Sequence, residues 1–399
     1  MMSVKQPKGQ AKRVNRCVLL ISPYSETIVS FRGALISDLI REGATVYVLA
    51  PDYTPPIRDA VERLGAIPLD YSLDRTGRTP LQDLRTLWEL WRILRRLRPD
   101  IILPYNIKPV IYGTLAGKLV GVPKRIALIP GLGYAFMKQN SLQHRILTWA
   151  VCRLYRLSLR YAHQVIFFNL TDLNEFLSLR LVSPQQALLL NGTGVNLAEW
   201  SVAPPATTPP TFTLAARLLR EKGVVEFAEA ARRIKARYPT ARFWLLGGLD
   251  TNPGALTRAE VEAWVKEGIL EWFGRVEDVR PYFAQTSVYV LPSYYREGVP
   301  RSTQEALAMG RPVITTDAPG CRETVVEGVN GFMVPPRDVE ALVRAMERFI
   351  REPELIVTMG CASRKLAEER FDVNQINREF LRVMGFDEHQ EHPNDSSRL

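Results

Sequence analysis

The sequence predicts an α/β protein with two domains, each a parallel β-sheet covered by helices on both faces. Its 399 residues exceed the roughly 250–300 residues at which a single hydrophobic core stops growing. Hydrophobic residues make up 46% and charged residues 24% of the chain, which is ordinary for a globular protein and excludes a mostly disordered one. Short apolar runs alternate with amphipathic stretches, and this rhythm is typical of parallel sheets.

The first half of the chain contains the first group of expected strands. Each run is short and rich in Val, Ile, Leu or Phe, which predicts burial on both faces of a sheet. The runs are residues 17–22 (CVLLIS), 45–50 (TVYVLA), 100–105 (DIILPY), 125–130 (RIALIP) and 164–168 (QVIFF). A helical pattern at residues 32–43 (RGALISDLIREG) separates the first two runs. We expect this helix to end at Gly43, since glycine commonly closes a helix.

A proline- and threonine-rich stretch, residues 202–210 (VAPPATTPP), interrupts this rhythm and predicts a linker. Strands are then expected at 212–217, 241–248, 288–293 and 312–316, with helices at 224–238 and from Ser302. We therefore predict an N-terminal domain at residues 1–200 and a C-terminal domain at residues 201–371. A helix at about 372–386 is expected to pack back on the first domain, before a polar tail at 387–399.

Several classes of protein are excluded by what the sequence lacks. No apolar run approaches the roughly 18 residues of a membrane-spanning helix, and no signal-peptide core follows the basic N-terminus. The four cysteines stand far apart, which excludes a zinc ribbon or a disulfide framework and suits a reducing cytoplasm. The turn after the first strand (SPYSETIVSFRG) has no G-x-G-x-x-G motif, and no Walker A motif occurs. Nicotinamide-dependent and P-loop enzymes are therefore not expected.

Positive charge is concentrated in the first half of the chain. The net charge is +10, and residues 1–200 hold 26 Lys and Arg against 14 Asp and Glu. Residues 201–399 hold 26 against 28, whereas residues 101–171 hold nine cations and no carboxylate. A one-sided basic surface favours an anionic partner, which would be a nucleic acid, a phosphorylated substrate or an anionic membrane. Solubility is the alternative explanation of the charge.

The first segment with candidate chemistry is AARLLREKGV in the predicted C-terminal domain. Arg217 and Lys222 bracket the end of an expected strand and a turn at Gly223. Two cations at the carboxyl end of such a strand can face an anion held in the crevice of an α/β sheet. Taken alone, the pair is equally compatible with ordinary surface residues.

The second segment is YYREGVPRSTQEALAMG. Glu297 is expected in a loop, and Glu305 follows it in a helix that begins near Arg301 or Ser302. The N–H groups of the first turn would point into the crevice, where they suit phosphate oxygens, and Glu305 would lie within reach of a ribose. Taken alone, the two glutamates are also compatible with ordinary loop and helix carboxylates.

Together, and in this order, the two segments resemble those of retaining glycosyltransferases of the GT-B fold, specifically the bacterial family-4 sugar transferases. The resemblance covers roughly residues 18–371 and implies two Rossmann-like domains facing across a cleft. It implies that Arg217, Lys222 and Glu297 are catalytic, with the two cations gripping the donor diphosphate and Glu297 beside the transferred sugar. Glu305 is implied to bind the ribose hydroxyls. The other implied donor-binding residues are Val276, in a segment (FGRVEDV) whose backbone receives the base, and Val299, Pro300, Arg301, Ser302 and Thr303.

Motifs of the first domain resemble the branch of this family that extends lipid-linked sugars for capsule, O-antigen or glycoprotein glycans. The motifs are SPYSETIVSFRG, YNIKPVIYG, IPGLGYAF and LNGTGVNL, and the implied acceptor-binding residues are Arg32, Asn106, Lys108, Gly131 and Gly133. Two features depart from the family pattern. Residues 26–28 replace a glycine pair, and residues 130–131 offer no counterpart to a histidine near the transferred sugar. Asn106 or Lys108 is expected to supply that hydrogen bond.

Two expected helices are basic and amphipathic. In residues 80–99, one side carries Leu84, Leu87, Trp88, Trp91, Leu94 and Leu97, which favours packing on the sheet over contact with a membrane. Residues 141–162 lie within the stretch that has no carboxylate. Basic helices with aromatic residues suit an anionic membrane interface. For this second helix we expect membrane or lipid-diphosphate contact through Arg145, Arg153, Arg156 and Arg160.

The resemblance implies transfer of a hexose or N-acetylhexosamine, with N-acetylgalactosamine favoured, from a UDP-sugar to an undecaprenyl-diphosphate-linked sugar. No D-x-D triplet or carboxylate cluster is visible in the sequence, so we expect neither a metal nor another cofactor. The expected location is the cytoplasm, peripheral on the anionic inner face of the cell membrane. One alternative is a soluble GT-B transferase acting on a small phosphorylated acceptor. Another is a basic nucleic-acid-binding protein, which is disfavoured because the aromatic residues lie in helices rather than on a basic sheet face.

Overall fold

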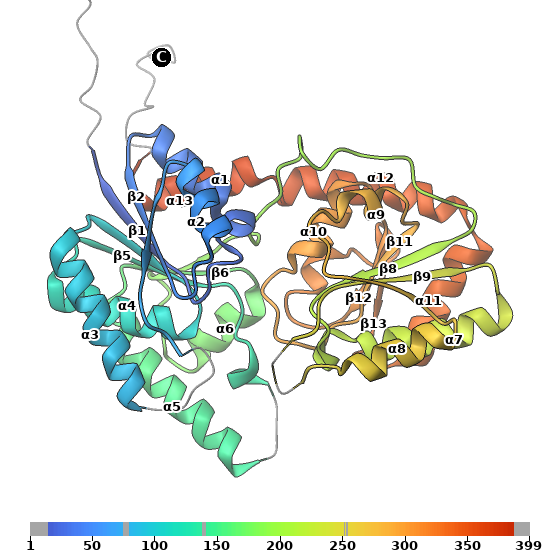
Figure 1. Cartoon of the computed structure of the whole chain (residues 1–399), viewed down its shortest axis with the longest axis horizontal. Helices are drawn as coiled ribbons and strands as arrows, with labels where there is room; N and C mark the ends of the chain where they lie inside the picture. Colours follow the sequence, from blue (N-terminus) through green and yellow to red (C-terminus); the bar gives the residue numbers. More distant parts are fainter. Residues whose placement is uncertain (1–14, 75–79, 138–140, 251, 253, 387–399) are drawn as a thin grey trace, which may run out of the picture. The chain divides into compact units, whose positions relative to one another are not determined.

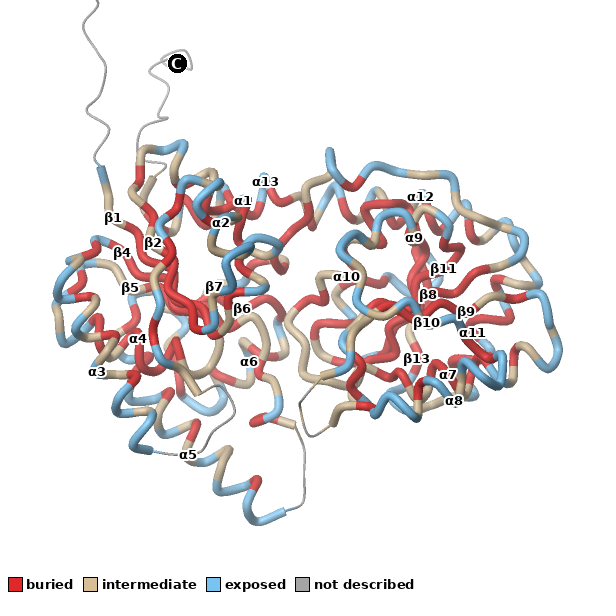
Figure 2. The backbone as a smooth tube through the Cα atoms, viewed as in Figure 1, coloured by how far each residue is buried: buried red, intermediate tan, exposed pale blue. Residues whose placement is uncertain are grey.

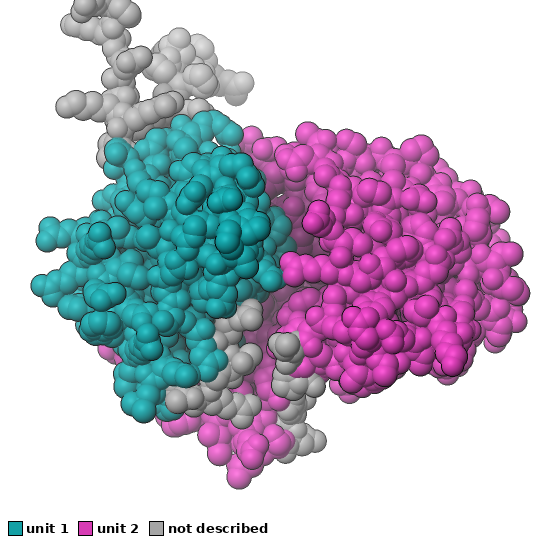
Figure 3. Space-filling model, in the orientation of Figure 1, with its two compact units in different colours: residues 1–127, 161–163, 380–399 teal, residues 128–160, 164–379 magenta. Residues whose placement is uncertain are grey.

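The computed structural model describes residues 15–74, 80–137, 141–250, 252 and 254–386 (Figure 1). Two compact units divide the chain (Figure 3). The first comprises residues 1–127, 161–163 and 380–399, and the second comprises residues 128–160 and 164–379, as far as these ranges are described. The predicted domains at 1–200 and 201–371, with a returning helix at about 372–386, stay a prediction. The predicted polar tail lies outside the described residues.

Two parallel sheets form the framework, as the sequence predicts. Within the described residues, the first sheet has the strand order β3-β2-β1-β4-β5-β6-β7 and the second the order β10-β9-β8-β11-β12-β13. In both, the first strand lies inside the sheet and the chain adds strands outward on either side, which is the doubly wound arrangement of Rossmann-like folds. The strands of the first sheet are β1 (Cys17–Ile21), β2 (Thr45–Ala50), β3 (Ile67–Asp70), β4 (Ile101–Pro104), β5 (Lys124–Ile129), β6 (Gln164–Phe167) and β7 (Ala187–Leu189). Those of the second are β8 (Thr211–Ala215), β9 (Arg242–Leu246), β10 (Glu271–Gly274), β11 (Val288–Leu291), β12 (Val313–Thr316) and β13 (Gly331–Val334).

Helices connect these strands. The helices before β8 are α1 (Ile28–Arg41), α2 (Pro55–Arg63), α3 (Pro80–Leu97), α4 (Ile107–Val120), the 3₁₀ helix η1 (Tyr134–Phe136), α5 (Leu142–Leu159) and α6 (Leu170–Ser178). Those after it are η2 (Arg220–Lys222), α7 (Val224–Arg237), α8 (Arg258–Lys266), α9 (Arg280–Ala284), α10 (Arg301–Ala308), η3 (Arg322–Thr324), α11 (Val339–Arg351), α12 (Glu354–Arg370) and α13 (Val373–Met384). Among the described residues, no helix is long and apolar enough to cross a membrane.

Burial on both faces explains why the central strands are continuous apolar runs. β1 pairs in parallel with β2 on one side and β4 on the other, and its last four residues are fully buried. Figure 2 shows the buried backbone concentrated in the strands of each sheet. The structure adds β3 and β7 at the edges of the first sheet. Both are short and only partly buried, so neither needs the long apolar run that marks the central strands.

Two predictions about helices need correction. α1 begins at Ile28, four residues before the predicted start, because the polar turn SPYSET already ends there. The predicted inward side of α3 is right only in part, since Leu94 is buried as expected. Its buried residues are Thr86, Leu90 and Leu94, whereas Leu84 and Trp88 are 61% and 53% exposed.

The second sheet has its own hydrophobic core. α7 packs beside α11, and Figure 1 shows α7, α8 and α11 on one side of the sheet and α9, α10 and α12 on the other. The rings of Phe212 and Phe243 stack at 5.3 Å on adjacent strands, and Phe227 of α7 meets Phe243 edge-on at 5.8 Å. This core holds the carboxyl ends of β8 and β11 in register, and the candidate chemistry follows those two ends.

Candidate functional site

Gly223 brings the first candidate segment against the second. The chain leaves β8, forms η2 and turns at Gly223 with φ +77° before α7 begins. A Cβ on Gly223 would lie 2.2 Å from the carbonyl oxygen of Pro292, so only glycine fits this close approach. Because Pro292 directly follows β11, the turn places Lys222 beside the loop that carries Glu297.

Lys222 and Glu297 form an ion pair. The Lys222 Nζ donates to the Glu297 Oε1, and the two side chains are only 14% and 11% exposed. Ser293 Oγ donates to the same carboxylate oxygen at 2.9 Å, and the Lys222 Nζ also lies 5.7 Å from the ring centre of Tyr295. The carboxylate is therefore held in one position by a cation and a hydroxyl.

The thiol of Cys321 lies close enough to this pair to feel the charges of Lys222 and Glu297. Cys321 is fully buried, and burial, assisted by the charge of Glu297, raises the pKa of Cys321 to about 12. A thiol with this pKa stays protonated near neutral pH, so Cys321 is not a nucleophile.

Glu305 lies on α10 and is paired within its own helix. The Arg301 Nε donates to the Glu305 Oε1 at 3.0 Å, and the side chains are 17% and 15% exposed. Burial raises the pKa of Glu305, and the charge of Arg301 opposes that rise. The carboxyl group thus keeps a proton at higher pH than an ordinary glutamate does.

Helix α10 begins at Arg301, where the sequence predicted a start at Arg301 or Ser302. Pro300 precedes the helix, which begins at Arg301. Thr303 Oγ1 donates to the Pro300 carbonyl at 2.7 Å, and the Tyr289 hydroxyl donates to Ser302 Oγ at 2.7 Å. The Thr303 hydroxyl hydrogen is used within the protein, whereas Ser302 accepts a bond and keeps its own O–H. This O–H and the backbone N–H groups of the first turn suit a phosphate.

The remaining donor candidates to be placed are Arg217, Val276 and Val299. Arg217 pairs with Asp250 at 3.0 Å, and its side chain is 57% exposed. Val276 lies half-buried in the loop between β10 and α9, and Val299 is buried before α10. The structure therefore joins Lys222 to Glu297 directly but leaves Arg217 on an exposed rim.

The loop carrying Glu297 is clamped by residues from the first half of the sequence that belong to the same unit. A Cβ on Gly298 would lie 1.6 Å from the Pro130 carbonyl oxygen, and one on Gly131 would lie 2.6 Å from the Gly298 nitrogen. The Gly133 nitrogen donates to the Arg296 carbonyl at 3.3 Å. Two of the predicted acceptor residues, Gly131 and Gly133, thus lie directly beside the loop that carries Glu297.

Sequence reasoning missed the side chains that complete this clamp. Arg296 Nη2 bonds Asp172 at 2.6 Å and Glu175 at 2.7 Å, and Asn169 Nδ2 donates to the Glu297 carbonyl at 3.3 Å. Burial raises the pKa of Asp172, and Arg296 opposes that rise. One available signal was the pattern FNLTD, because Asn169 caps α6 by accepting from the Asp172 nitrogen and Asn is a preferred helix cap.

The other acceptor candidates lie in the first unit. Arg32 is only 3% exposed, and its guanidinium lies 5.2 Å from the Tyr105 ring centre and 5.9 Å from that of Phe380. Asn106 precedes α4 with φ +67°. The Lys108 Nζ bonds Asp83 at 2.7 Å, so its ammonium group is shared with a carboxylate.

The four predicted membrane-contact arginines are Arg145, Arg153, Arg156 and Arg160. They follow one another along α5 and its C-terminal cap, and all four are exposed. In the described ranges of the chain, no group of three or more His, Cys, Asp or Glu side chains gathers as metal ligands would.

Comparisons with known proteins converge on one kind of enzyme. Residues 18–169 match the family model described as glycosyl transferase 4-like, and residues 209–352 match the model described as glycosyl transferases group 1. The N,N'-diacetylbacillosaminyl-diphospho-undecaprenol alpha-1,3-N-acetylgalactosaminyltransferase of Campylobacter jejuni is 27% identical, over 91% of this chain and 96% of that protein. The UDP-Gal:alpha-D-GlcNAc-diphosphoundecaprenol alpha-1,3-galactosyltransferase of Escherichia coli is 23% identical, over 71% and 75%.

Solved structures show the same fold. Sucrose-phosphate synthase from Thermosynechococcus elongatus has a TM-score of 0.75 and 18% identity, covering 93% of this chain and 98% of that one. The Anabaena protein HepE in complex with UDP has a TM-score of 0.71 and 16% identity, covering 92% and 99%.

Proposed function

The chain is a glycosyltransferase of the GT-B fold, and from this premise we propose that it moves a sugar from a UDP-sugar to an undecaprenyl-diphosphate-linked sugar. The favoured donor is a hexose or N-acetylhexosamine, with N-acetylgalactosamine first. The names of the Campylobacter jejuni and Escherichia coli relatives support this acceptor class, since both act on diphospho-undecaprenol-linked sugars. The proposal includes retention of the anomeric configuration and a reaction without a metal.

The observation that carries the proposal is the Lys222–Glu297 pair beside the start of α10. When a sugar–nucleotide bond breaks, negative charge grows on the leaving diphosphate and positive charge on the sugar ring. Lys222 has three N–H donors, so it can hold Glu297 and a phosphate oxygen together. The N–H groups at the start of α10 add a second set of donors for the diphosphate. Arg217 reaches the same diphosphate by exchanging Asp250 for it.

Glu297 then faces the developing positive charge. In the proposed step the bond between the anomeric carbon and the UDP oxygen breaks while the acceptor oxygen attacks on the same face. The acceptor proton passes to the departing phosphate oxygen, which leaves as UDP. A covalent glycosyl-enzyme would need a second carboxylate flanking the bond. The buried Cys321 does not supply a nucleophile either, because its raised pKa keeps the thiol protonated.

The acceptor class implies a place at the membrane. We propose that the enzyme is cytoplasmic and binds peripherally to the anionic inner face of the cell membrane through Arg145, Arg153, Arg156 and Arg160. The exposure of all four arginines supports this proposal, as does the concentration of cations in residues 101–171.

A panel of UDP-sugars tests the proposed function. The purified chain is incubated with undecaprenyl-diphosphate-linked N-acetylglucosamine and bacillosamine acceptors, and products are identified by mass spectrometry. We expect one sugar to be added with the α configuration of its donor, as read by NMR, and equal rates with and without EDTA. Transfer only to small phosphorylated sugars would instead establish the soluble alternative. Loss of activity in EDTA would disprove the metal-independent reaction.

A further inference from the structure

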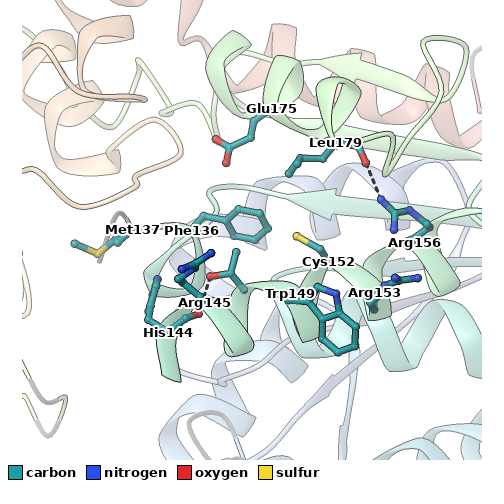
Figure 4. Close-up of a pocket in the computed structure, with 11 residues that line it drawn as sticks. Phe136, Met137, His144, Arg145, Trp149, Cys152, Arg153, Arg156, Glu175 and Leu179 are labelled. Carbon is teal, nitrogen blue, oxygen red and sulfur yellow. Dashed lines mark hydrogen bonds between the residues drawn. The ribbon is translucent and has the colours of Figure 1, made fainter. Parts of the chain in front are cut away.

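A groove of about 540 Å³ lies between α5, α6 and η1, entirely within the second unit (Figure 4). Arg145, Trp149, Arg153 and Arg156 line it from α5, and Glu175 lines it from α6. Figure 4 shows the α5 side chains on one side and Glu175 across from them. The volume is within the roughly 300–1,000 Å³ typical of ligand sites. We call this feature the α5–α6 groove.

The guanidinium groups in the groove have N–H donors that can bind a ligand. Among the residues that the structure describes, neither Arg145 nor Arg153 has an ion-pair partner. Arg156 donates one bond, to the Leu179 carbonyl at 2.9 Å, and keeps its other N–H donors. Glu175 is the only carboxylate among the described lining residues, and Arg296 already pairs with it at 2.7 Å.

The charge of the groove and its wall matches a diphosphate diester. The groove and its wall contain four positive and two negative side chains. The positive ones are Arg145, Arg153, Arg156 and Arg296, and the negative ones are Asp172 and Glu175. This leaves two positive charges uncompensated, and a diphosphate diester carries about two negative charges near neutral pH. Guanidiniums bind phosphate oxygens with two parallel hydrogen bonds, so they suit this group better than a lone cation would.

His144 adds an independent sign of a ligand. The residue lines the groove and is only 6% exposed, with its ring edge-on to that of Tyr134 at 5.2 Å. Within the described part of the chain, neither ring nitrogen has a hydrogen-bond partner. A buried polar group without a partner is costly. Because both nitrogens are closed off from solvent, the ring must turn toward the groove before a phosphate oxygen there can accept its N–H.

The apolar surface beside the cations indicates a ligand with a hydrocarbon tail. Phe136, Trp149 and Leu179 line the groove together with the arginines. From Trp149 an exposed apolar row continues along α5, with Leu142 70%, Ile146 57%, Trp149 61% and Leu157 43% exposed. These residues are spaced by four, three and eight residues, about one or two helical turns, and therefore share one side of the helix.

The groove is also joined to the catalytic loop. Glu175 in its wall pairs with Arg296, and Arg296 directly precedes Glu297. η1, which contributes Phe136, starts one residue after Gly133, whose nitrogen donates to the Arg296 carbonyl. A ligand held in the groove would therefore lie near the loop that faces the transferred sugar.

We propose that the α5–α6 groove binds the diphosphate and first isoprene units of the lipid-linked acceptor. Arg145, Arg153 and Arg156 hold the phosphate oxygens, His144 donates an N–H to them, and Trp149 covers the prenyl chain. This inference rests on the proposed function, because it names where the diphosphate of that acceptor is held.

A binding experiment without any sugar separates the two ideas. Farnesyl diphosphate is titrated into the protein by calorimetry, and Cys152, which lines the groove, is then alkylated and quantified by peptide mass spectrometry. We expect the ligand to bind and to slow alkylation of Cys152. The exposed Cys361 on α12 should react at an unchanged rate, which makes it the internal control.

The variants Arg145→Gln and Arg153→Gln should each raise the Kd for farnesyl diphosphate by about tenfold or more, the loss expected for a charge-assisted contact. Arg344→Gln, an exposed arginine on α11, removes the same charge outside the groove and should leave that Kd unchanged. In transfer assays the two groove variants should raise KM for the lipid-diphosphate acceptor without lowering kcat. A neutral octyl glycoside bearing the same acceptor sugar should show no change in KM.

The outcomes test the groove assignment separately from the proposed transfer to a lipid-linked sugar. If lipid-diphosphate acceptors are extended but both variants keep the normal KM and Cys152 is not protected, the groove assignment is wrong and the proposed function stands. If the variants lose binding to phosphatidylglycerol vesicles yet keep the normal Kd for farnesyl diphosphate, the arginines contact lipid headgroups and the assignment is again wrong. Protection of Cys152 without transfer to any lipid-linked sugar would keep the groove and overturn the proposed acceptor.

Discussion

Lys222 and Glu297 depend on each other because both side chains are largely removed from water. Lys222→Ala should lower turnover by roughly two orders of magnitude, the effect expected when one charge-stabilising donor is lost. Glu297→Gln should lower the rate of the chemical step while the affinity for UDP stays normal, since the proposed partner of Glu297 is the sugar. Steady-state rates at saturating donor and UDP calorimetry measure the two effects. A normal rate for either variant would remove that residue from the mechanism.

The same pair makes a prediction about stability. Lys222→Ala leaves a buried carboxylate without its cation, which is more costly than removing both charges. The double variant Lys222→Ala/Glu297→Gln should therefore unfold at a higher temperature than Lys222→Ala alone, although it is no more active. Calorimetric unfolding of the two variants and the unaltered protein provides the comparison. Equal melting temperatures would mean that water already compensates Glu297.

Glu305 gives donor binding a dependence on pH. Burial raises its pKa while Arg301 opposes the rise, so protonation begins at higher pH than for an ordinary glutamate. The proposed contact with the ribose hydroxyls uses the charged form. The affinity for UDP should therefore be highest above this raised pKa and should fall as the pH drops through it. Glu305→Gln should bind UDP weakly at every pH, with a flat profile.

Glu297→Gln serves as the control for this profile, because its affinity for UDP should fall with pH as in the unaltered protein. If the Glu305→Gln variant keeps the original pH profile, another group controls donor binding.

At the scale of elements, the loop after β11 is held by its fit to the loop after β5. Gly298→Ala would place a Cβ 1.6 Å from the Pro130 carbonyl oxygen, so one of the two loops must move. We expect a loss of about 1–3 kcal/mol in stability, as for other overpacked sites, and a fall in kcat because Glu297 moves with its loop.

Gly268→Ala is the matched control for this change. Gly268 has φ +72° with no atom within 4 Å of an added Cβ, so the substitution adds backbone strain of about 1 kcal/mol without a steric clash. It should lower the melting temperature slightly and leave kcat unchanged. Comparable kcat losses in the two variants would show that the position of the Glu297 loop does not depend on Pro130.

Elements also differ in how well a sequence predicts them. The end of α1 near Gly43 and the start of α10 at Arg301 agree with local signals, since a left-handed glycine and a helix-compatible proline act through the backbone nearby. The inward side of α3 could be predicted only in part, because the helix buries Leu94 as expected but also buries Thr86 while Trp88 stays exposed. An aromatic residue on a helix is apolar whether it faces a sheet or lies exposed, so the sequence pattern alone does not indicate which side of the helix is buried.

At the scale of the whole molecule, the uneven charge predicts attachment to anionic membranes. The variant with Arg145, Arg153, Arg156 and Arg160 all changed to Gln should bind phosphatidylglycerol vesicles roughly a thousandfold more weakly, at about 1 kcal/mol per arginine. Co-sedimentation at low salt measures this partitioning. Raising the salt concentration should weaken binding of the unaltered protein in the same direction, since the attraction fades within a Debye length of about 8–10 Å.

A second quadruple variant controls for net charge. It changes Arg232, Arg258, Arg344 and Arg348, on α7, α8 and α11, to Gln. This variant loses the same charge and should keep its vesicle binding. If both quadruple variants bind alike, attachment depends on net charge and not on α5.

The sequence by itself determined the framework and which side chains are candidates for the site. The alternation of apolar runs and helices predicted two parallel sheets, because a strand buried on both faces must be apolar along its whole length. Lys222, Glu297 and Glu305 were predicted from the resemblance of their two segments to a known family, since the local patterns alone are equally compatible with ordinary surface residues. The clamp of Pro130, Gly131 and Gly133 against the Glu297 loop was decided only by the tertiary structure. So were the Arg296–Glu175 pair and the α5–α6 groove. Their partners lie more than 100 residues apart or on separate helices, and periodicity reports which side of an element is buried, never which distant side chain meets it there.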